Sequence, residues 1–356
     1  MIKGFDPRRH VGVHPERVSH VSSTDYPGHY PGEDDSWDLK KFKKRLAVRV
    51  ERLSNRSIDF DLVGVDASIA NAFRRILIAE VPTVCIERVY VFDNTSIIVD
   101  EVLAHRLGLV PLNIDPALMD CEPPEGQPTD RNTLVFKLRA RCERRRNAPK
   151  ESEDPAELYI NHEVLSSQLE WSPQGEQAIV LAQNPPAPAN RNIVLVKLRP
   201  GQEVDMELHA VKGLGKDHAK FSPVATASYR LLPKIILNPE KPVPSHLVEK
   251  FKNCFSDGVI KVNPRTKEVS VDENQVRREK MSREVYRHHE FEGCVQLARV
   301  RDHFLFNIES EGFYPPERLL PEAITVLRTK ISAIRNAARV LLDHGGLTED
   351  VEMAER

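Results

Sequence analysis

Residues 212–227, KGLGKDHAKFSPVATA, gather the residue types of three different kinds of functional site. Glycines beside a lysine occur in loops that wrap backbone amides around phosphate groups. A serine near a histidine can act as a nucleophile with its base. Exposed lysine and histidine donors can instead bind an acidic surface of another protein. The spacing of these residues and the rest of the chain decide among the three.

The phosphate-binding interpretation fails on spacing. GLGK at 213–216 lacks the GxxxxGK[ST] pattern, and the chain contains no GxGxxG, HExxH or GxSxG motif. A hydrolase site is also a poor fit, because Asp217 directly precedes His218 and neighbours in sequence rarely orient one another for catalysis. Pro223 follows Ser222 and removes an N–H that often helps to bind an oxyanion. We therefore expect no catalytic residues in this chain.

A surface loop that docks on another protein explains the same residues better. Gly213 and Gly215 would let the backbone turn sharply. Lys216, His218 and Lys220 would then project donors toward an acidic partner surface.

The cysteines predict neither a disulfide framework nor a metal site. The five thiols, at positions 85, 121, 142, 254 and 294, are far apart, odd in number and without a CxxC pair. His288 and His289 precede Cys294 in the charged run YRHHEFEGC, which lacks the spacing of metal ligands. We expect no metal and no cofactor.

Composition excludes further classes. The 356 residues are 40% hydrophobic and 29% charged, with a net charge of −2, so no global basic field draws the chain to nucleic acid. No apolar run is long enough to span a membrane, and the N-terminus lacks the apolar core of a signal peptide. We expect an intracellular protein, cytosolic or nuclear. Three basic runs, 40–45, 137–146 and 277–280, are interpreted as solvated faces, although KKFKKR at 40–45 could also serve in nuclear import.

The N-terminal third begins with a polar, proline-rich segment, 1–38, which we expect to become ordered only against a partner, if at all. Alternating apolar residues then predict a hairpin, in which LAVRVERL and SIDFDLVG flank the turn SNRS. A helix is expected from the N-cap Asp66 to Pro82. A strand follows at CIERVYVFD, and a second helix from Asp100 should bury Leu103 and Leu107.

The middle of the chain changes character. Residues 113–225 alternate strands such as TLVFKLRARC and EVDMELHAV with polar, proline-rich connectors, which predicts an inserted, mostly β domain. A third unit covers 238–296 and contains a hairpin pattern at GVIKVNPRTKEVSVD.

The C-terminal segment predicts a long helix with a narrow apolar seam. Its seam residues recur at spacings of four and three, and Gly345 and Gly346 are expected to end the helix. Such a seam needs one partner helix, in another chain or in its own; packing within the chain is the alternative. The seam consists of Leu320, Ile324, Leu327, Ile331, Ile334, Ala338 and Leu341.

Four ordered motifs resemble the alpha-like subunits of cellular RNA polymerases. They are ANAFRRILIAEVPT, DEVLAHRLGLVPL, GKDHAKFSPVATA and the long C-terminal helix, and the resemblance covers about 40 to 345. The chain's size, its N-terminal arm and RVRDHFLFNIESEG look most like the larger alpha-like subunit shared by eukaryotic RNA polymerases I and III, in the family that includes the bacterial alpha N-terminal domain and the archaeal D subunit.

The resemblance implies an α+β fold in which a discontinuous dimerisation domain carries an inserted, mostly β domain and a degenerate ferredoxin-like domain. Its implied parts are an N-terminal arm at 1–45, a dimerisation domain at 46–112, 226–237 and 297–345, the insert domain at 113–225, the ferredoxin-like domain at 238–296 and a tail at 346–356.

The resemblance also implies a non-catalytic scaffold. Together with a smaller alpha-like subunit it would form the platform for the two large catalytic subunits, which hold the active site. Transcription of rRNA, 5S rRNA and tRNA in the nucleus, including the nucleolus, follows from membership of polymerases I and III. No membrane and no sequence-specific nucleic-acid contact are expected.

Interface residues carry over position by position. The heterodimer surface would combine the C-terminal seam with the apolar face of the first helix, formed by Ile69, Phe73, Ile76 and Leu77. Docking of the second-largest subunit would use Arg74, Arg75, Lys216, His218 and Lys220.

Two departures from the family pattern bear on the assignment. The polymerase II relative carries a zinc-binding cysteine cluster in its insert domain, whereas only Cys121 and Cys142 lie there in this chain. Some archaeal relatives hold iron–sulfur clusters, for which Cys254 and Cys294 supply too few ligands. The alternatives are the polymerase II version, a free nucleic-acid-binding factor and, remotely, a hydrolase built on His218 and Ser222.

Overall fold

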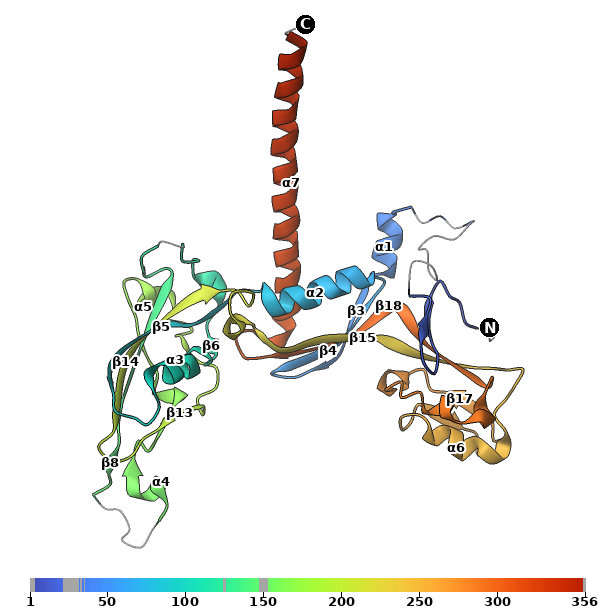
Figure 1. Ribbon diagram of the computed structural model, residues 1–356, viewed down its shortest axis with the longest axis horizontal. Coiled ribbons are helices and arrows are strands. Elements are labelled where there is room, and N and C mark those ends of the chain that lie inside the picture. The colour runs from blue at the N-terminus through green and yellow to red at the C-terminus, as the bar shows by residue number, and fades with distance from the viewer. Residues whose placement is uncertain are drawn as a thin grey trace. The chain divides into compact units, whose positions relative to one another are not determined.

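The computed structural model describes residues 4–21, 32, 34, 36–123, 126–146 and 153–354, with side chains described as far as Leu342. Helices and antiparallel sheets are mixed along the chain, so its fold class is α+β (Figure 1). The chain divides into two compact units, and each is described by itself. The first comprises Met1–Arg52, Ile58–Ala72 and Ser228–Asn307; the second comprises Leu53–Ser57, Phe73–Ala227 and Ile308–Arg356.

A six-stranded sheet lies at the centre of the first unit. Its order is β2-β1-β18-β4-β3, and β15 also pairs with β18. The stacked rings of Phe60 and Phe306, 5.0 Å apart between centroids, join two neighbouring strands in its core. The strands are β1 (His10–Val13), β2 (Val18–Ser19), β3 (Ala47–Leu53), β4 (Ser57–Val63), β15 (Val224–Leu237) and β18 (Val295–Ser310).

The expected hairpin at 46–63 is confirmed as β3 and β4, joined through the bond from Ser54 N to Ser57 O. The two strands differ in burial. The alternating apolar residues of β4 are buried, whereas Val48 and Val50 of the edge strand β3 are exposed.

The N-terminal segment is more ordered than the sequence suggests. Strand β1 pairs with β18 from His10 opposite Val300 to Val13 opposite Leu297. Val13 is fully buried, and its carbonyl accepts a hydrogen bond from the Tyr286 hydroxyl. The expectation that residues 1–38 need a partner to become ordered is therefore wrong for this stretch, because HVGV supplies β-branched residues to an open sheet edge.

Residues 238–296 supply most of a small core in the first unit, which also includes Val13, Ile235 and Leu297. Its largest fully buried rings are Phe251 and Phe291, and Cys254 and Cys294 are buried with them. The expected hairpin is confirmed as β16 (Ile260–Val262) and β17 (Val269–Val271), beside helix α6 (Val248–Asn253).

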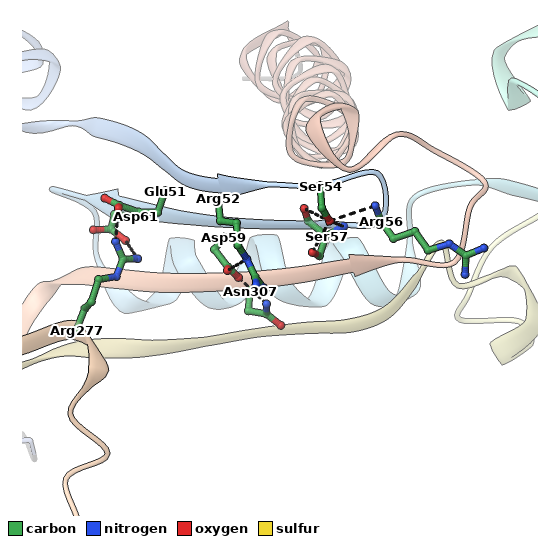
Figure 2. A network of polar contacts seen from close by, with 9 residues as sticks. All are labelled: Glu51, Arg52, Ser54, Arg56, Ser57, Asp59, Asp61, Arg277 and Asn307. Atoms are coloured by element: carbon green, nitrogen blue, oxygen red, sulfur yellow. Dashed lines mark hydrogen bonds and ion pairs between the residues drawn. The ribbon is translucent and has the colours of Figure 1, made fainter. Parts of the chain in front are cut away.

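Arg277, from the third basic run, is not part of a solvated face. Its guanidinium pairs with Glu51 at 2.6 Å and with the buried Asp61 at 3.0 Å, and His303 Nε2 lies 2.9 Å from the same carboxylate. Figure 2 shows Arg277 reaching the carboxylates of the hairpin. The interpretation of this run as solvated is wrong at Arg277, because an unpaired Asp61 would be costly to bury.

The second unit is built on the sheet β11-β7-β14-β5. Strand β14 (Glu203–Gly213) alternates buried and half-buried side chains, and strand β7 (Thr133–Arg141) alternates buried and exposed ones after four buried residues. Helix α3 (Asp100–Gly108) buries Leu103 and Leu107, which is also confirmed. The remaining strands are β5 (Thr83–Asn94), β6 (Leu112–Asn113), β8 (Glu143–Arg144), β9 (Tyr159–Ile160), β10 (Glu163–Leu165), β11 (Glu170–Ser172), β12 (Ala187–Pro188) and β13 (Val194–Lys197), with helices α4 (Pro155–Leu158) and α5 (Gln177–Val180).

Three further helices complete the fold. Helix α1 covers Leu39–Arg45, and α2 covers Ala67–Ala79. Asp66 Oδ1 accepts the Ser68 N–H at 2.8 Å, as its N-cap assignment predicts. Helix α7 runs from Pro316 to Ala354. None of the helices in the described part of the chain is long and apolar enough to span a membrane.

The expected end of the C-terminal helix is wrong. Helix α7 continues through Gly345 and Gly346 to Ala354. Glycine in a helix interior costs about 1 kcal/mol relative to alanine, which weakens a helix without ending it.

Candidate partner-binding surface

The outer part of helix α7 exposes an apolar seam. Every described side chain from Arg328 to Leu342 is exposed, except the half-buried Ser332. Ile331 is 57% exposed, Ile334 71% and Leu341 73%. Contiguous aliphatic side chains of this size are unusual on a free surface and mark an interaction site.

The inner part of the same seam behaves differently. Its residues Leu320 and Leu327 are half-buried, and beside them Leu319 and Ala323, which are not seam residues, are fully buried. Ile324, 40% exposed, marks the change. Packing within the chain, the alternative for this helix, therefore describes only its first turns; Ile331, Ile334, Ala338 and Leu341 are left available.

Arg318 fixes the base of α7. Its guanidinium forms a two-point ion pair with Asp115 and also binds Glu322 at 2.8 Å. The Arg318 hydrogen bonds hold the pKa of Asp115 below its usual value, and the same bonds raise the pKa of Arg318. The base of the helix is thus held by a charged anchor.

Two further contacts support this anchor. The Tyr314 hydroxyl donates to the Pro82 carbonyl at 2.8 Å, and burial raises the pKa of this phenol. Farther along, Lys330 Nζ lies 2.8 Å from both carboxylate oxygens of Glu80, just beyond α2. The residues just before α7, through Tyr314, and the start of its outer part, through Lys330, are therefore both tied to the segment that follows α2.

Helix α2 presents less apolar surface than its sequence predicts. Ile76 and Leu77 are buried in the chain's own core, at 2% and 0% exposure. Their assignment to a partner surface is corrected, because one face of the helix is used within the chain. Ile69 is exposed and Phe73 is half-buried, so these two stay available.

The predicted docking arginines lie on the same helix. Arg75 is exposed and Arg74 is half-buried. Arg75 has no ion pair among the residues that the structure describes.

The loop at 212–222 is fastened to the C-terminal end of α2. The Lys216 N–H donates to the Ala79 carbonyl at 2.8 Å, which satisfies one of the acceptors left open at a helix end. A Cβ at Gly215 would lie 2.3 Å from the Ile78 carbonyl oxygen, and one at Gly213 would lie 2.7 Å from the Phe221 ring. Neither glycine has a positive φ. Because they have no side chain, Gly215 can lie against the Ile78 carbonyl and Gly213 against the Phe221 ring. The sharp turn that the sequence predicts is not their role.

Strand β5 holds the other end of the loop. Thr83 Oγ1 donates to the Phe221 carbonyl at 2.7 Å, and the Cys85 thiol donates to the Lys220 carbonyl at 3.1 Å. The loop is therefore held at both ends.

Only part of the predicted donor set faces solvent. Lys216 and His218 are exposed. Lys220 turns inward: its ammonium donates to the Ile86 carbonyl at 2.8 Å and pairs with Glu87, and its side chain is only 11% exposed. The expectation that Lys220 projects a donor is wrong, because the carbonyl and carboxylate of β5 already bind it.

The candidate dyad is not assembled. His218 Nδ1 accepts the Lys220 N–H at 3.1 Å, and the Ser222 hydroxyl donates to the Val224 carbonyl at 3.1 Å. Both groups cap local backbone turns, which is the structural role that histidine and serine commonly have in loops.

Three of the buried thiols are poor metal ligands. Burial raises the pKa of Cys85 to about 12, and it also raises the pKa values of Cys142 and Cys254. Metal ions bind the thiolate, which these groups do not readily form. Within the described ranges, no three His, Cys, Asp or Glu residues are grouped to hold a metal ion.

The exposed seam of α7 is narrow and apolar, which suits packing against one further helix. A family model described as the RNA polymerase Rpb3/Rpb11 dimerisation domain matches residues 59–331, from β4 into α7. The chain belongs to this family. The expected membership of the alpha-like subunits is thereby confirmed, and with it the expected α+β alpha-like fold class.

Individual members of the dimerisation-domain family are similar over most of their length. The chain is 50% identical to the DNA-directed RNA polymerases I and III subunit RPAC1 of Mus musculus over 315 residues, 88% of this chain and 90% of that protein. It is 46% identical to RPAC1 of Saccharomyces cerevisiae over 330 residues, 92% and 97% of the two chains. The chain is 31% identical to the DNA-directed RNA polymerase II subunit rpb3 of Dictyostelium discoideum over 315 residues, which are 84% of this chain and 97% of that protein.

Sequence reasoning missed the residues that anchor helix α7. Arg318 and Asp115 lie 203 positions apart, and neither belongs to a motif. The Lys330–Glu80 pair is likewise long-range, with 250 positions between its partners. Only the position of Arg318 in the first turns of an expected helix could have suggested an anchoring role.

Proposed function

We propose that this chain is a non-catalytic assembly subunit of DNA-dependent RNA polymerases I and III. The exposed seam of α7 carries the proposal. Burial of Ile331, Ile334 and Leu341 against one partner helix would contribute about 1.5–3 kcal/mol for each side chain. The partner proposed is the smaller alpha-like subunit, whose own long helix would supply the matching seam.

The heterodimer would act as the platform for the two large subunits, which hold the active site. Arg75, Lys216 and His218, all exposed, are the residues proposed to dock the second-largest subunit, together with the half-buried Arg74. The loop at 212–222 suits this role, because a surface fixed at both ends loses little entropy on binding. The proposed roles are transcription of rRNA, 5S rRNA and tRNA, with location in the nucleus and the nucleolus. The domain boundaries implied by the resemblance remain part of this proposal.

Polymerase II membership is the second candidate. Polymerases I and III are favoured because named subunits of those enzymes share 35–50% identity with this chain, against 31% for the polymerase II subunit. A free nucleic-acid-binding factor is disfavoured by the net charge of −2.

Affinity purification tests the proposal. The tagged full-length chain is recovered from nuclear extract, and the proteins retained at high salt are identified by mass spectrometry. Recovery of a smaller alpha-like subunit with the large subunits of polymerases I and III supports it. Recovery with polymerase II alone assigns the chain to the other branch, and recovery with nucleic acid alone rejects the assembly role.

A further inference from the structure

Helix α1 is a basic element that the proposed assembly role does not use. Its seven residues, Leu39–Arg45, read LKKFKKR and include five basic side chains, all exposed. Within the described residues, the one ion pair of these side chains joins Lys41 to Asp34 at 3.9 Å, between two exposed groups. Such a pair contributes little, so the positive charge of α1 stays available to a partner.

The helix is held mainly by local contacts. Asp38 caps it by accepting the N–H groups of Lys40 at 2.7 Å and Lys41 at 3.3 Å. It has no buried residue, and at its end the Arg45 carbonyl lies against Gly64, directly after β4. A helix this short is marginal without tertiary packing, so residues 40–44 can become extended at little cost in free energy.

The neighbouring side chains favour a protein partner. Trp37, 74% exposed, contacts Phe42 at 5.0 Å between ring centroids, and Leu39 is exposed beside them. The two rings lie against each other rather than forming an open platform for bases. A basic strip next to exposed apolar groups matches an acidic groove with apolar walls.

We propose that residues 40–45 are a nuclear-import sequence, bound in extended form by the acidic groove of an import receptor. The location of the chain in the nucleus, on which this inference rests, belongs to the proposed function. Recognition by the receptor does not depend on polymerase assembly, and the two are measured separately.

The first test is direct binding. The full-length chain, purified in complex with its smaller alpha-like partner, is titrated against a purified armadillo-repeat import adaptor. The variant Lys40→Ala/Lys43→Ala/Lys44→Ala removes three charges and keeps good helix formers. The control Lys252→Ala/Arg265→Ala/Lys280→Ala removes three exposed charges from residues 238–296. We expect the first variant to lose at least about tenfold in affinity and the control to match the wild type.

The second test is location in cells. The first variant should still co-purify with the smaller partner, yet its nuclear-to-cytoplasmic ratio should fall while that of the control does not. Equal adaptor affinities, no binding of the wild type, or an unchanged cellular ratio would each overturn the inference. The inference would also be overturned if the first variant lost affinity for a single-stranded RNA probe and kept its affinity for the adaptor. Helix α1 would then be a nucleic-acid contact. Failure of the proposed function would appear in a different measurement: affinity purification of the wild-type chain would recover no polymerase subunits.

Discussion

Arg318 and Asp115 form a two-point ion pair, with Nη1 to Oδ2 at 2.6 Å and Nη2 to Oδ1 at 3.0 Å. Planar, two-point pairs of this kind fix orientation as well as adding energy. Arg318 lies in the first turn of α7 and Asp115 follows β6, so the pair orients the base of the helix.

Removal of this pair should loosen the base of α7. We expect Arg318→Ala to lower the free energy of unfolding by about 1–2 kcal/mol, a modest value because both side chains remain partly exposed to water. Urea unfolding of the full chain, followed by circular dichroism, measures the change. Arg328→Ala, on an exposed turn of the same helix, is the matched control and should leave the unfolding midpoint unchanged.

The pH dependence gives this pair a signature. Arg318 lowers the pKa of Asp115 in the folded chain below its ordinary value of 3.8. The stabilisation is therefore fully present above the pKa that Asp115 has in the unfolded chain, and it is lost as the pH falls through the pKa that Asp115 has in the folded chain. The difference between wild type and Arg318→Ala should stay constant from about pH 7 to 5 and shrink below about pH 4. A difference that disappears already between pH 7 and 5 would assign the effect to another group.

Two lysines of the loop should respond in opposite ways. Lys220→Ala removes the ammonium that binds the carbonyl of the buried Ile86 and pairs with the exposed Glu87, so we expect a loss of about 1–3 kcal/mol in stability, chiefly from the unpaired carbonyl. Lys216→Ala should leave stability unchanged, because its side chain is exposed, and should instead weaken binding to the second-largest subunit. Thermal unfolding and pull-down of that subunit separate the two. Equal stability of both variants would contradict the inward position of Lys220.

The thiols should differ in reactivity. Cys121 is exposed, whereas the other four cysteines are buried and Cys85 has a pKa of about 12. At about pH 8 the native chain should therefore react rapidly with one equivalent of a maleimide, and Cys121→Ser should abolish this fast phase. Mass spectrometry of the labelled chain counts the adducts; in urea all five thiols should react. Rapid labelling of Cys85 in the native chain would show that its site opens readily.

Local periodicity made much of the fold predictable. The alternation in β7 and β14, and the spacing of Leu103 and Leu107 in α3, express the geometry of a single element, which sequence alone reveals. The C-terminal seam was equally predictable, because its spacing of four and three residues does not depend on what packs around the helix. The family was identifiable from four short motifs in a fixed order.

Tertiary relations were not predictable in this way. Periodicity places Ile76 and Leu77 on one face of α2, but it does not say that the chain's own core covers that face. Lys220 looks like a surface donor until strand β5 is placed beside it. Gly215 matters because of the Ile78 carbonyl, 137 positions earlier, and no local pattern reports such an approach.

The most direct test of the central claim is co-elution of the chain with the smaller alpha-like subunit on size-exclusion chromatography after co-expression. Ile331→Asp/Ile334→Asp would bury two unpaired charges in the seam, at a cost of several kcal/mol. The control Thr329→Asp/Asn336→Asp places two charges on the opposite side of the same exposed helix. We expect the seam variant to elute without the partner and the control to remain in complex. If the seam variant still co-elutes as the wild type does, the outer part of α7 is not the dimerisation surface.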